Sequence, residues 1–132
     1  MQVYLDTSAL VKLVVSEPES ASLRDYLASH PQDVRFTAAL SRAELLRAVG
    51  RSGSFDAVAH ARRVLSRLDM VALNHRLLDE AGSLGPAWLR TLDAIHLAAA
   101  LTAPALRAFV CYDTRLAEAA DMMGINVAMP RT

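Results

Sequence analysis

The chain has one cysteine, one lysine and no long hydrophobic run. Because Cys111 has no second cysteine to pair with, an internal disulfide is excluded, and no Cys/His spacing is typical of zinc. The apolar stretches are short and interrupted by polar residues, so none can span a bilayer, and nothing at the N-terminus resembles a signal peptide. The sequence therefore predicts a cytoplasmic protein that does not enter a membrane.

The chain also has no net charge, since its 14 basic and 14 acidic residues cancel. This balance argues against a protein that binds polyanions through bulk charge, but it leaves open a local basic rim around a local acidic site. Lys12 is the only lysine, and the other thirteen basic residues are arginines. The guanidinium fork suits phosphate and carboxylate partners, although the codon bias of a GC-rich genome would produce the same excess.

What the chain does contain is a large apolar fraction, 53% of its 132 residues. This fraction excludes a disordered chain, and the length suits one compact domain over residues 1–132. So many apolar residues over a small surface also suggest a face that is covered by a partner or within a homodimer.

Short apolar strands alternate with amphipathic helices along the sequence. We expect strands at 2–5, 34–38, 70–73, 108–112 and 125–129. We expect helices at 8–15, 18–30, 40–50, 55–68, 75–85, 91–101 and 114–124, and we expect Gly82 to Pro86 to break the helix that starts at 75. This alternation predicts an α/β fold with a twisted, mainly parallel sheet that helices cover on both faces.

Four acidic residues are placed differently from the acids on polar helix faces. Asp6 follows the apolar stretch VYL, and Asp113 follows FVCY. Glu44 lies between apolar residues in AELL, and Asp93 lies in the first turn of the most apolar helix. In an open parallel sheet, ligands bind outside the carboxyl ends of the strands. We therefore expect the four carboxylates to converge at that edge.

Each acid also has a simpler interpretation, which is a role in starting a helix. Asp6 and Asp113 can cap the helices that follow them, since Asp is a favoured N-cap residue. If Asp6 instead binds a ligand, Thr7 and Ser8 can take over the capping, or they can orient Asp6 or a water bound beside it.

Asp93 and Glu44 have helix-start interpretations of their own. Asp93 can complement the helix dipole behind a Thr91 cap, which is worth about 0.3–1 kcal/mol. Glu44 fits a capping box in which its side chain reaches back to the amide of Ser41. These interpretations leave unexplained why all four acids lie beside apolar residues.

Electrostatics favours a bound cation if the four acids converge. Two carboxylates ~4 Å apart repel by about 4 kcal/mol at an effective dielectric constant of about 20. Such a cluster takes up protons or binds a cation, and an all-oxygen ligand set suits Mg²⁺ or Mn²⁺. A site of this kind indicates phosphodiester hydrolysis, in which one ion generates hydroxide and another stabilises the leaving oxygen.

Four sequence blocks occur in a fixed order over almost the whole chain: VYLDTSALVKL, SRAELLRAV, TLDAIHLAAAL and CYDTRLAEAA. In these blocks the chain resembles the PIN domain, and more narrowly the VapC-type toxins of bacterial type II toxin–antitoxin systems. The resemblance implies a PIN-like three-layer α/β/α fold and a metal-dependent endoribonuclease that cleaves RNA. It also implies a small VapB-type antitoxin that covers the site, and a homodimer.

By the same resemblance, four acids are the catalytic residues and the ligands of Mg²⁺ or Mn²⁺: Asp6, Glu44, Asp93 and Asp113. Members of the family often carry another acid next to the last one, where this chain has Thr114. That difference counts against a second tightly held ion, although Thr114 can hydrogen-bond a water or a phosphate oxygen.

Three residues near the acids have two interpretations each. His96 lies three residues after Asp93 and can steady it or donate to substrate, or it can pack as a partly buried histidine. Arg115 can contact phosphate or an antitoxin carboxylate, or it can be a solvated helix residue. Trp88 can stack on an RNA base, or it can pack a loop or an interface.

Two other functional classes are alternatives. The first is a haloacid dehalogenase-like phosphatase with Asp6 as its nucleophile. That class usually has a second acid two residues later, where this chain has Ser8, and a late lysine, whereas Lys12 is the only lysine. The second is a catalytically inactive RNA-binding or regulatory module, against which the absent basic stripe and the absent late lysine both count.

Overall fold

The computed structural model describes all 132 residues, and its centre is one five-stranded sheet. Every strand pair is parallel, and the strand order is β3-β2-β1-β4-β5. The strands are β1 (Gln2–Leu5), β2 (Val34–Ala38), β3 (Asp69–Val71), β4 (Leu106–Val110) and β5 (Val127–Ala128). The predicted mainly parallel sheet is thus confirmed, and it is parallel throughout.

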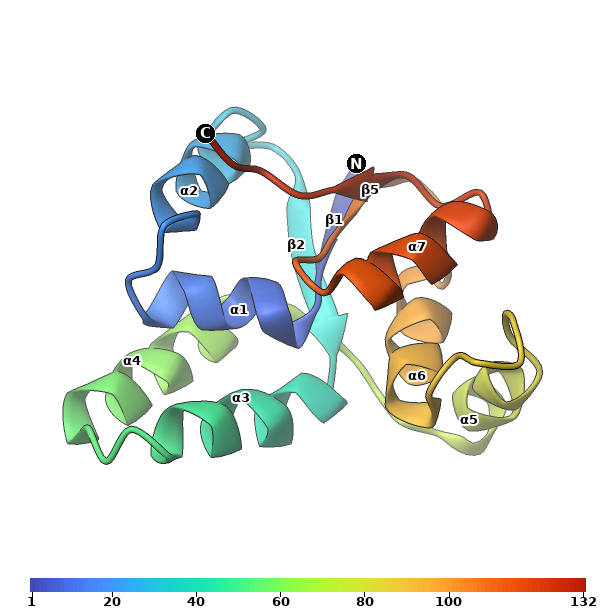
Figure 1. Cartoon of the computed structure of the whole chain (residues 1–132), viewed down its shortest axis with the longest axis horizontal. Coiled ribbons are helices and arrows are strands. Elements are labelled where there is room, and N and C mark those ends of the chain that lie inside the picture. Colours follow the sequence, from blue (N-terminus) through green and yellow to red (C-terminus); the bar gives the residue numbers. More distant parts are fainter.

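Helices cover both faces of the sheet, which makes the predicted three-layer α/β/α architecture (Figure 1). One layer contains α1 (Thr7–Val14), α2 (Ser20–Ala28), α3 (Leu40–Gly50) and α4 (Phe55–Ser66). The other contains α5 (His75–Gly82), α6 (Thr91–Ala100) and α7 (Thr114–Met122). None of these helices has both the length and the apolar character that crossing a membrane requires.

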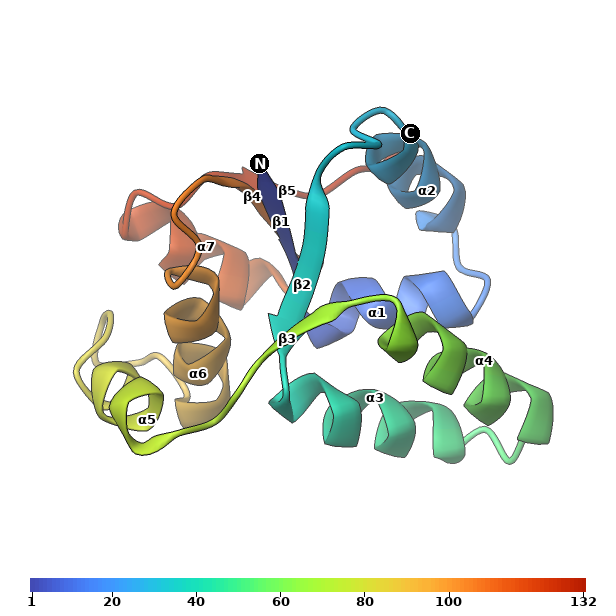
Figure 2. The ribbon, with the colours of Figure 1, turned by 180° about the vertical axis from the view of Figure 1, so that it is seen from behind.

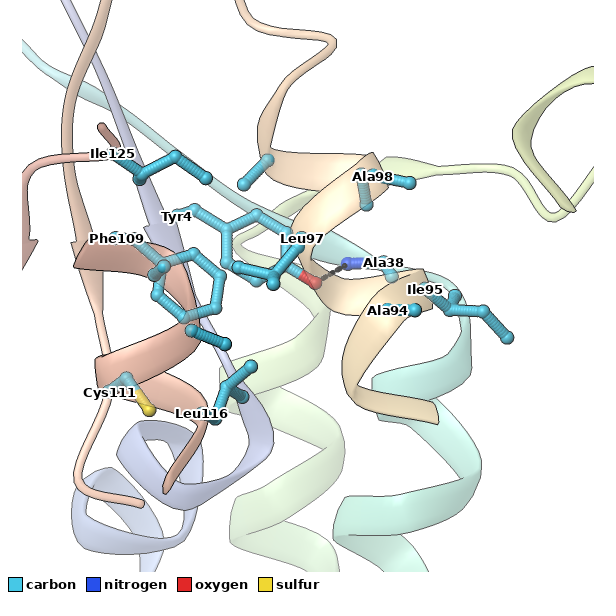
Figure 3. Close-up of a cluster of buried hydrophobic side chains, with 14 of the residues drawn as sticks. Tyr4, Ala38, Ala94, Ile95, Leu97, Ala98, Phe109, Cys111, Leu116 and Ile125 are labelled. Atoms are coloured by element: carbon cyan, nitrogen blue, oxygen red, sulfur yellow. Dashed lines mark hydrogen bonds between the residues drawn. The ribbon is translucent and has the colours of Figure 1, made fainter. Parts of the chain in front are cut away.

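The two faces of β1 belong to two separate cores, because successive strand residues point to opposite faces. Val3 and Leu5 pack with α1 to α4. Tyr4 packs on the opposite face, where its ring stacks on Phe109 of β4 with centroids 5.1 Å apart (Figure 3). Each side chain of this central strand therefore helps to fix one helical layer against the sheet.

Several predicted element boundaries are wrong at one or both ends. The helix expected at 8–15 starts at Thr7, and the fourth strand spans 106–110 instead of 108–112. The strand expected at 125–129 is reduced to Val127–Ala128, whereas the helix that starts at 75 ends at Gly82, as the predicted break requires. Helix 55–68 ends at Ser66 and strand 70–73 spans Asp69–Val71. The fourth strand ends at Val110 because its pairs with β1 and β5 end there, and it starts at Leu106 because that residue already pairs with Gln2 of β1.

An ion pair joins the loop before β2 to β4. The Arg107 guanidinium donates through both Nε and Nη2 to the two carboxylate oxygens of Asp33. This two-point contact lowers the pKa of Asp33 to about 2, from an ordinary value of 3.8. Because the folded pKa is depressed, the pair stabilises the fold above the ordinary value, and that stability is lost as the pH falls toward 2.

The Asp33 pair predicts a pH-dependent loss of stability in a single variant. Asp33→Asn should lower the thermal midpoint at neutral pH, because Arg107 loses its charged partner. The difference from wild type should shrink as the pH falls through the range between the two pKa values, since wild-type Asp33 then becomes protonated as well. Thermal unfolding followed by circular dichroism measures this, with Asp25→Asn on the exposed face of α2 as the control. A difference that stays constant down to acidic pH would contradict the assignment.

Candidate active site

Asp6 lies directly after β1, and its carboxylate is 3% exposed. Its Oδ1 accepts hydrogen bonds from the Ala9 amide at 3.1 Å and from the Ser8 hydroxyl at 2.6 Å, so Asp6 is the N-cap of α1. The prediction that Thr7 and Ser8 take over the capping is wrong, because α1 begins at Thr7 and the Ser8 hydroxyl bonds to Asp6 itself. Asp6 therefore caps the helix with one oxygen and keeps Oδ2 outside that cap.

Ser8 also ties Asp6 to the neighbouring strand. Its Oγ accepts a hydrogen bond from the amide of Tyr112 at 2.9 Å, just beyond β4. The amide of Asp6 in turn donates to the carbonyl of Val110 at 3.2 Å. Burial raises the pKa of Asp6, and the hydrogen bond from Ser8 and the nearby His96 offset only part of that effect.

Glu44 lies in the second turn of α3, where two donors hold one of its oxygens. Its Oε1 accepts from the Thr7 hydroxyl at 2.6 Å and lies 2.7 Å from Nε2 of His96. The capping-box interpretation is therefore wrong. The N-cap position of α3 is Ala39, which provides no side-chain cap, and Ser41 is buried against Thr37 instead.

The electrostatic setting of Glu44 differs from that of Asp6. Burial by itself would raise the pKa of Glu44, but the hydrogen bonds from His96 and Thr7 outweigh it and lower the pKa. Glu44 is therefore held as a carboxylate. Of the interpretations of His96, packing in the interior is confirmed, since the residue is 3% exposed, and its ring hydrogen-bonds Glu44 and not Asp93.

Asp93 lies in the first turn of α6, half-buried, and its side chain accepts no hydrogen bond. The expected Thr91 cap is wrong, because Thr91 is already inside the helix and the N-cap position is Arg90. Burial raises the pKa of Asp93, and the charge of Asp113 raises it further. The charges of His96 and Arg90 offset only part of this rise.

Asp113 is exposed and precedes α7. Its Oδ1 accepts hydrogen bonds from the amides of Arg115 at 3.0 Å and Leu116 at 3.2 Å, so its capping interpretation is confirmed. Its effect on the pKa of Asp93 means that the two carboxylates lie within electrostatic reach of each other. A cap that uses one oxygen leaves the other available for a ligand, as at Asp6.

The four acids lie near one another at the carboxyl edge of the sheet, although they do not form a closed cage. The strands β1 and β4 are adjacent, and Asp6 and Asp113 follow their carboxyl ends. Glu44 reaches the same edge through its bond to Thr7. No three His, Cys, Asp or Glu side chains converge tightly enough to hold a metal ion. Gathering around a cation therefore requires side-chain rotation, and Asp93, whose side chain accepts no hydrogen bond, is the acid least constrained against it.

The donor set nevertheless fits a hard divalent cation. All four side chains offer carboxylate oxygens, which Mg²⁺ and Mn²⁺ prefer. Asp93 and Asp113 repel each other, and a positive ion between them would remove that penalty.

Arg115 and Trp88 contact each other beside this edge. The Arg115 guanidinium donates to the carbonyl of Trp88 at 3.1 Å and lies over its ring at 5.3 Å from the centroid. Arg115 is therefore not a free helix-face residue, and the Trp88 ring packs partly against the core beside α6. Their contacts with phosphate or a base, and those of exposed Thr114, stay predictions.

Tyr4 is a residue of this site that the acid pattern does not identify, and its hydroxyl lies 2.6 Å from Nδ1 of His96. A signal was present, because a tyrosine in an otherwise aliphatic buried strand needs a partner for its hydroxyl. That partner lies 92 residues away in sequence, and the pattern of β1 could not identify it.

The sequence is similar to that of known proteins over most of its length. A model of the PIN domain matches residues 3–122. The chain belongs to the PIN domain family. It is 47% identical over 130 residues to Ribonuclease VapC46 of Mycobacterium tuberculosis, with 97% of each chain covered. It is 44% identical over 131 residues to Ribonuclease VapC47 of the same species, covering 97% of this chain and 96% of that one.

Solved structures of this PIN family member's relatives share its fold. VapC20 of M. tuberculosis, described as a sarcin-ricin loop cleaving toxin, has a TM-score of 0.74 at 18% identity, over 97% of this chain and 99% of that one. VapBC2 of Rickettsia felis, solved with a promoter DNA fragment, has a TM-score of 0.74 at 17% identity, over 97% and 98%. The predicted PIN-like fold and the resemblance to VapC ribonucleases are confirmed.

The raised pKa of Asp93 predicts a variant that is more stable than wild type. In the presence of a chelator at neutral pH, Asp93→Asn should raise the thermal midpoint, because burial and the charge of Asp113 oppose ionised Asp93 more than the nearby Arg90 and His96 favour it. The gain should shrink as the pH falls through the raised pKa of folded Asp93, and it should vanish below the ordinary value of 3.8, where Asp93 is protonated in both the folded and the unfolded chain. Thermal unfolding tests this, with exposed Asp79→Asn as the control. A loss of stability in Asp93→Asn would show that the charge is compensated in the fold.

Proposed function

We propose that this PIN domain protein is a divalent-metal-dependent endoribonuclease and the toxin of a type II toxin–antitoxin module. The observation that carries the proposal is the set of four acids at the carboxyl edge of β1 and β4, in a chain that matches the PIN model over most of its length. Relatives at 44–47% identity are named ribonucleases, and this supports the proposal.

The four acids share one role in this proposal, which is to bind the metal ion. Asp6, Glu44, Asp93 and Asp113 would hold Mg²⁺ or Mn²⁺, which when bound supplies charge neutralisation and a nucleophilic hydroxide for attack on phosphorus. The Ser8 hydroxyl orients Asp6 through Oδ1, and the Thr7 hydroxyl holds Glu44 through Oε1. The second oxygen of each carboxylate would then bind the ion. Thr114 follows Asp113 where a further acid is common, and this favours a single tightly held ion.

The phosphatase alternative finds little support in the surroundings of Asp6. The Lys12 ammonium, the one lysine available to a bound phosphoryl group, pairs with Glu17 and Glu19 and lies over the ring of Tyr112. Oδ1 of the buried Asp6 also accepts hydrogen bonds from the Ala9 amide and the Ser8 hydroxyl, which occupy it in the α1 cap. An inactive RNA-binding or regulatory module would have no use for the mutual repulsion of Asp93 and Asp113.

The partners are proposed from chemistry and from the relatives. RNA is the substrate, a VapB-type antitoxin covers the site, and the toxin forms a homodimer. VapBC assemblies among the structural relatives support the antitoxin partner, as in R. felis VapBC2 and Haemophilus influenzae VapBC-1. A cytoplasmic location, where RNA is available, also stays a prediction.

Asp6→Asn provides the direct test of the proposed activity. The substitution keeps an oxygen that can cap α1 but removes the charge needed to hold a cation, so the fold should persist while RNA cleavage falls to background. Cleavage of total RNA with Mg²⁺, Mn²⁺ or chelator measures the activity, and circular dichroism checks the fold. The proposal fails if the folded variant cuts RNA as fast as wild type, or if wild type cuts equally well in chelator.

The arginines are unevenly distributed, and this favours an RNA substrate. Residues 39–68, which form the α3–α4 hairpin, carry six arginines and two acids, a net charge of +4 that the rest of the chain balances with −4. All six are exposed and none forms an ion pair: Arg42, Arg47, Arg51, Arg62, Arg63 and Arg67. The hairpin leads away from the carboxyl end of β2 (Figure 2), so RNA phosphates flanking a cut at the acids can reach it.

The hairpin predicts a binding defect without a catalytic defect. Arg51→Gln with Arg63→Gln should raise KM and leave kcat near wild type, because Arg51 lies at the far end of α3 from Glu44 and Arg63 lies on α4. The slope of log K against log salt for single-stranded RNA should fall by about 0.7 per lost phosphate contact. The matched control is Arg24→Gln with Arg131→Gln, two exposed arginines outside the hairpin. Equal effects of the two pairs would exclude a hairpin-specific contact.

A further inference from the structure

A chain of hydrogen bonds runs through the interior from the sheet to Glu44. The Ala38 amide of β2 donates to the Tyr4 hydroxyl at 3.1 Å, a contact drawn in Figure 3. The Tyr4 hydroxyl lies 2.6 Å from Nδ1 of His96, and Nε2 of His96 lies 2.7 Å from Oε1 of Glu44. Four elements far apart in sequence, namely β2, β1, α6 and α3, are linked by these three contacts.

The chemistry of the two ends decides where the protons lie. An amide N–H only donates, so the Tyr4 oxygen accepts from Ala38, and a carboxylate only accepts, so Nε2 of His96 must carry the proton toward Glu44. The Tyr4 proton then needs an acceptor. Nδ1 lies 2.6 Å away, and the Thr37 hydroxyl, which also contacts Tyr4, is itself paired with Ser41. A proton on Nδ1 would remove this acceptor and, in the neutral ring, would set the Nε2 lone pair against the carboxylate.

The Tyr4 hydroxyl has little freedom to break this arrangement. Its ring stacks on Phe109 and meets Phe36 edge-on, each at 5.1 Å between centroids. His96 is itself 3% exposed, with its ring 5.9 Å from that of Tyr4. Packing therefore fixes the position of the hydroxyl, and the hydroxyl fixes the tautomer of the imidazole.

The tautomer of His96 determines which oxygen of Glu44 is held and which is free. Both donors, Thr7 and His96, bind Oε1, and Oε2 accepts no hydrogen bond. We infer that His96 is a positioning residue, held by Tyr4 in the Nε2–H tautomer, which clamps Oε1 of Glu44 and presents Oε2 to a divalent cation. The second half of this inference rests on the proposed function, whereas the tautomer does not.

Replacements at His96 separate the clamp from simple packing. His96→Gln retains an amide N–H that can take the place of Nε2–H, whereas His96→Leu fills the space without a donor. His96→Leu should weaken Mn²⁺ binding by about 10-fold or more, and His96→Gln should remain closer to wild type. Calorimetric titration with Mn²⁺ measures this without reference to cleavage. Leu97→Ala, a cavity variant on the same helix, should lower the thermal midpoint and leave Mn²⁺ affinity unchanged.

The tautomer has its own spectroscopic readout. In ¹⁵N-labelled protein in chelator, the His96 ring should show a protonated Nε2 and an unprotonated Nδ1, and Tyr4→Phe should disturb that pattern. A protonated Nδ1 in wild type overturns the inference. So does wild-type Mn²⁺ affinity in His96→Leu when Glu44→Ala has lost binding. If wild-type protein itself binds no Mn²⁺, the proposed metal site fails, while the nitrogen spectrum still decides the tautomer.

Discussion

The parallel pairing of β1 with β4 is the contact on which the candidate site depends. The strand order reverses direction at this pair, and ligands of open parallel sheets bind at such a point. The pairing continues past the strands, since the Asp6 amide bonds to Val110 and Ser8 accepts from Tyr112. The first and last acids, 107 residues apart in number, are placed at one edge by this pairing alone. Displacing either strand would separate them.

The fold lowers the pKa of one acid of the site and raises the pKa of two others. Glu44 is stabilised as a carboxylate by donors within the fold, so its charge is present before any ligand arrives. Asp6 and Asp93 have raised pKa values, because burial opposes their charge and, at Asp93, Asp113 opposes it further. A site of this kind is fixed on one side and electrostatically unsatisfied on the other. Ionised Asp6 and Asp93 are therefore destabilised in the fold, and a bound divalent cation would remove that free-energy penalty.

The sequence predicts much of this arrangement, and its failures share a physical cause. The alternation of strands and helices identifies the three-layer fold, and the acids at strand ends are found from position alone. Helix starts are predicted less well. The Ser41–Glu44 spacing fits a capping box, but the box does not form. Ser41 hydrogen-bonds Thr37 instead, and Glu44 hydrogen-bonds His96. Capping and ligand binding are not exclusive at Asp6, because its Oδ1 caps α1 while Oδ2 stays free for a ligand.

The His96 contact could not be predicted because it is set by packing. Spacing along α6 places His96 near Asp93, and this is the neighbour that local reasoning selects. In the fold, the ring instead meets Tyr4 from one strand and Glu44 from a helix on the other layer. Long-range partners of buried polar groups follow from strand order and helix docking, neither of which the local pattern contains.

The central claim is that the four acids form one cation site, and the location of a bound Mn²⁺ tests it most directly. A crystal grown with Mn²⁺ can be examined by anomalous scattering, which identifies the ion independently of cleavage. We predict an anomalous peak bounded by Asp6, Glu44, Asp93 and Asp113. Ordered crystals in which saturating Mn²⁺ gives no peak at this edge, or a peak only elsewhere, would contradict the account.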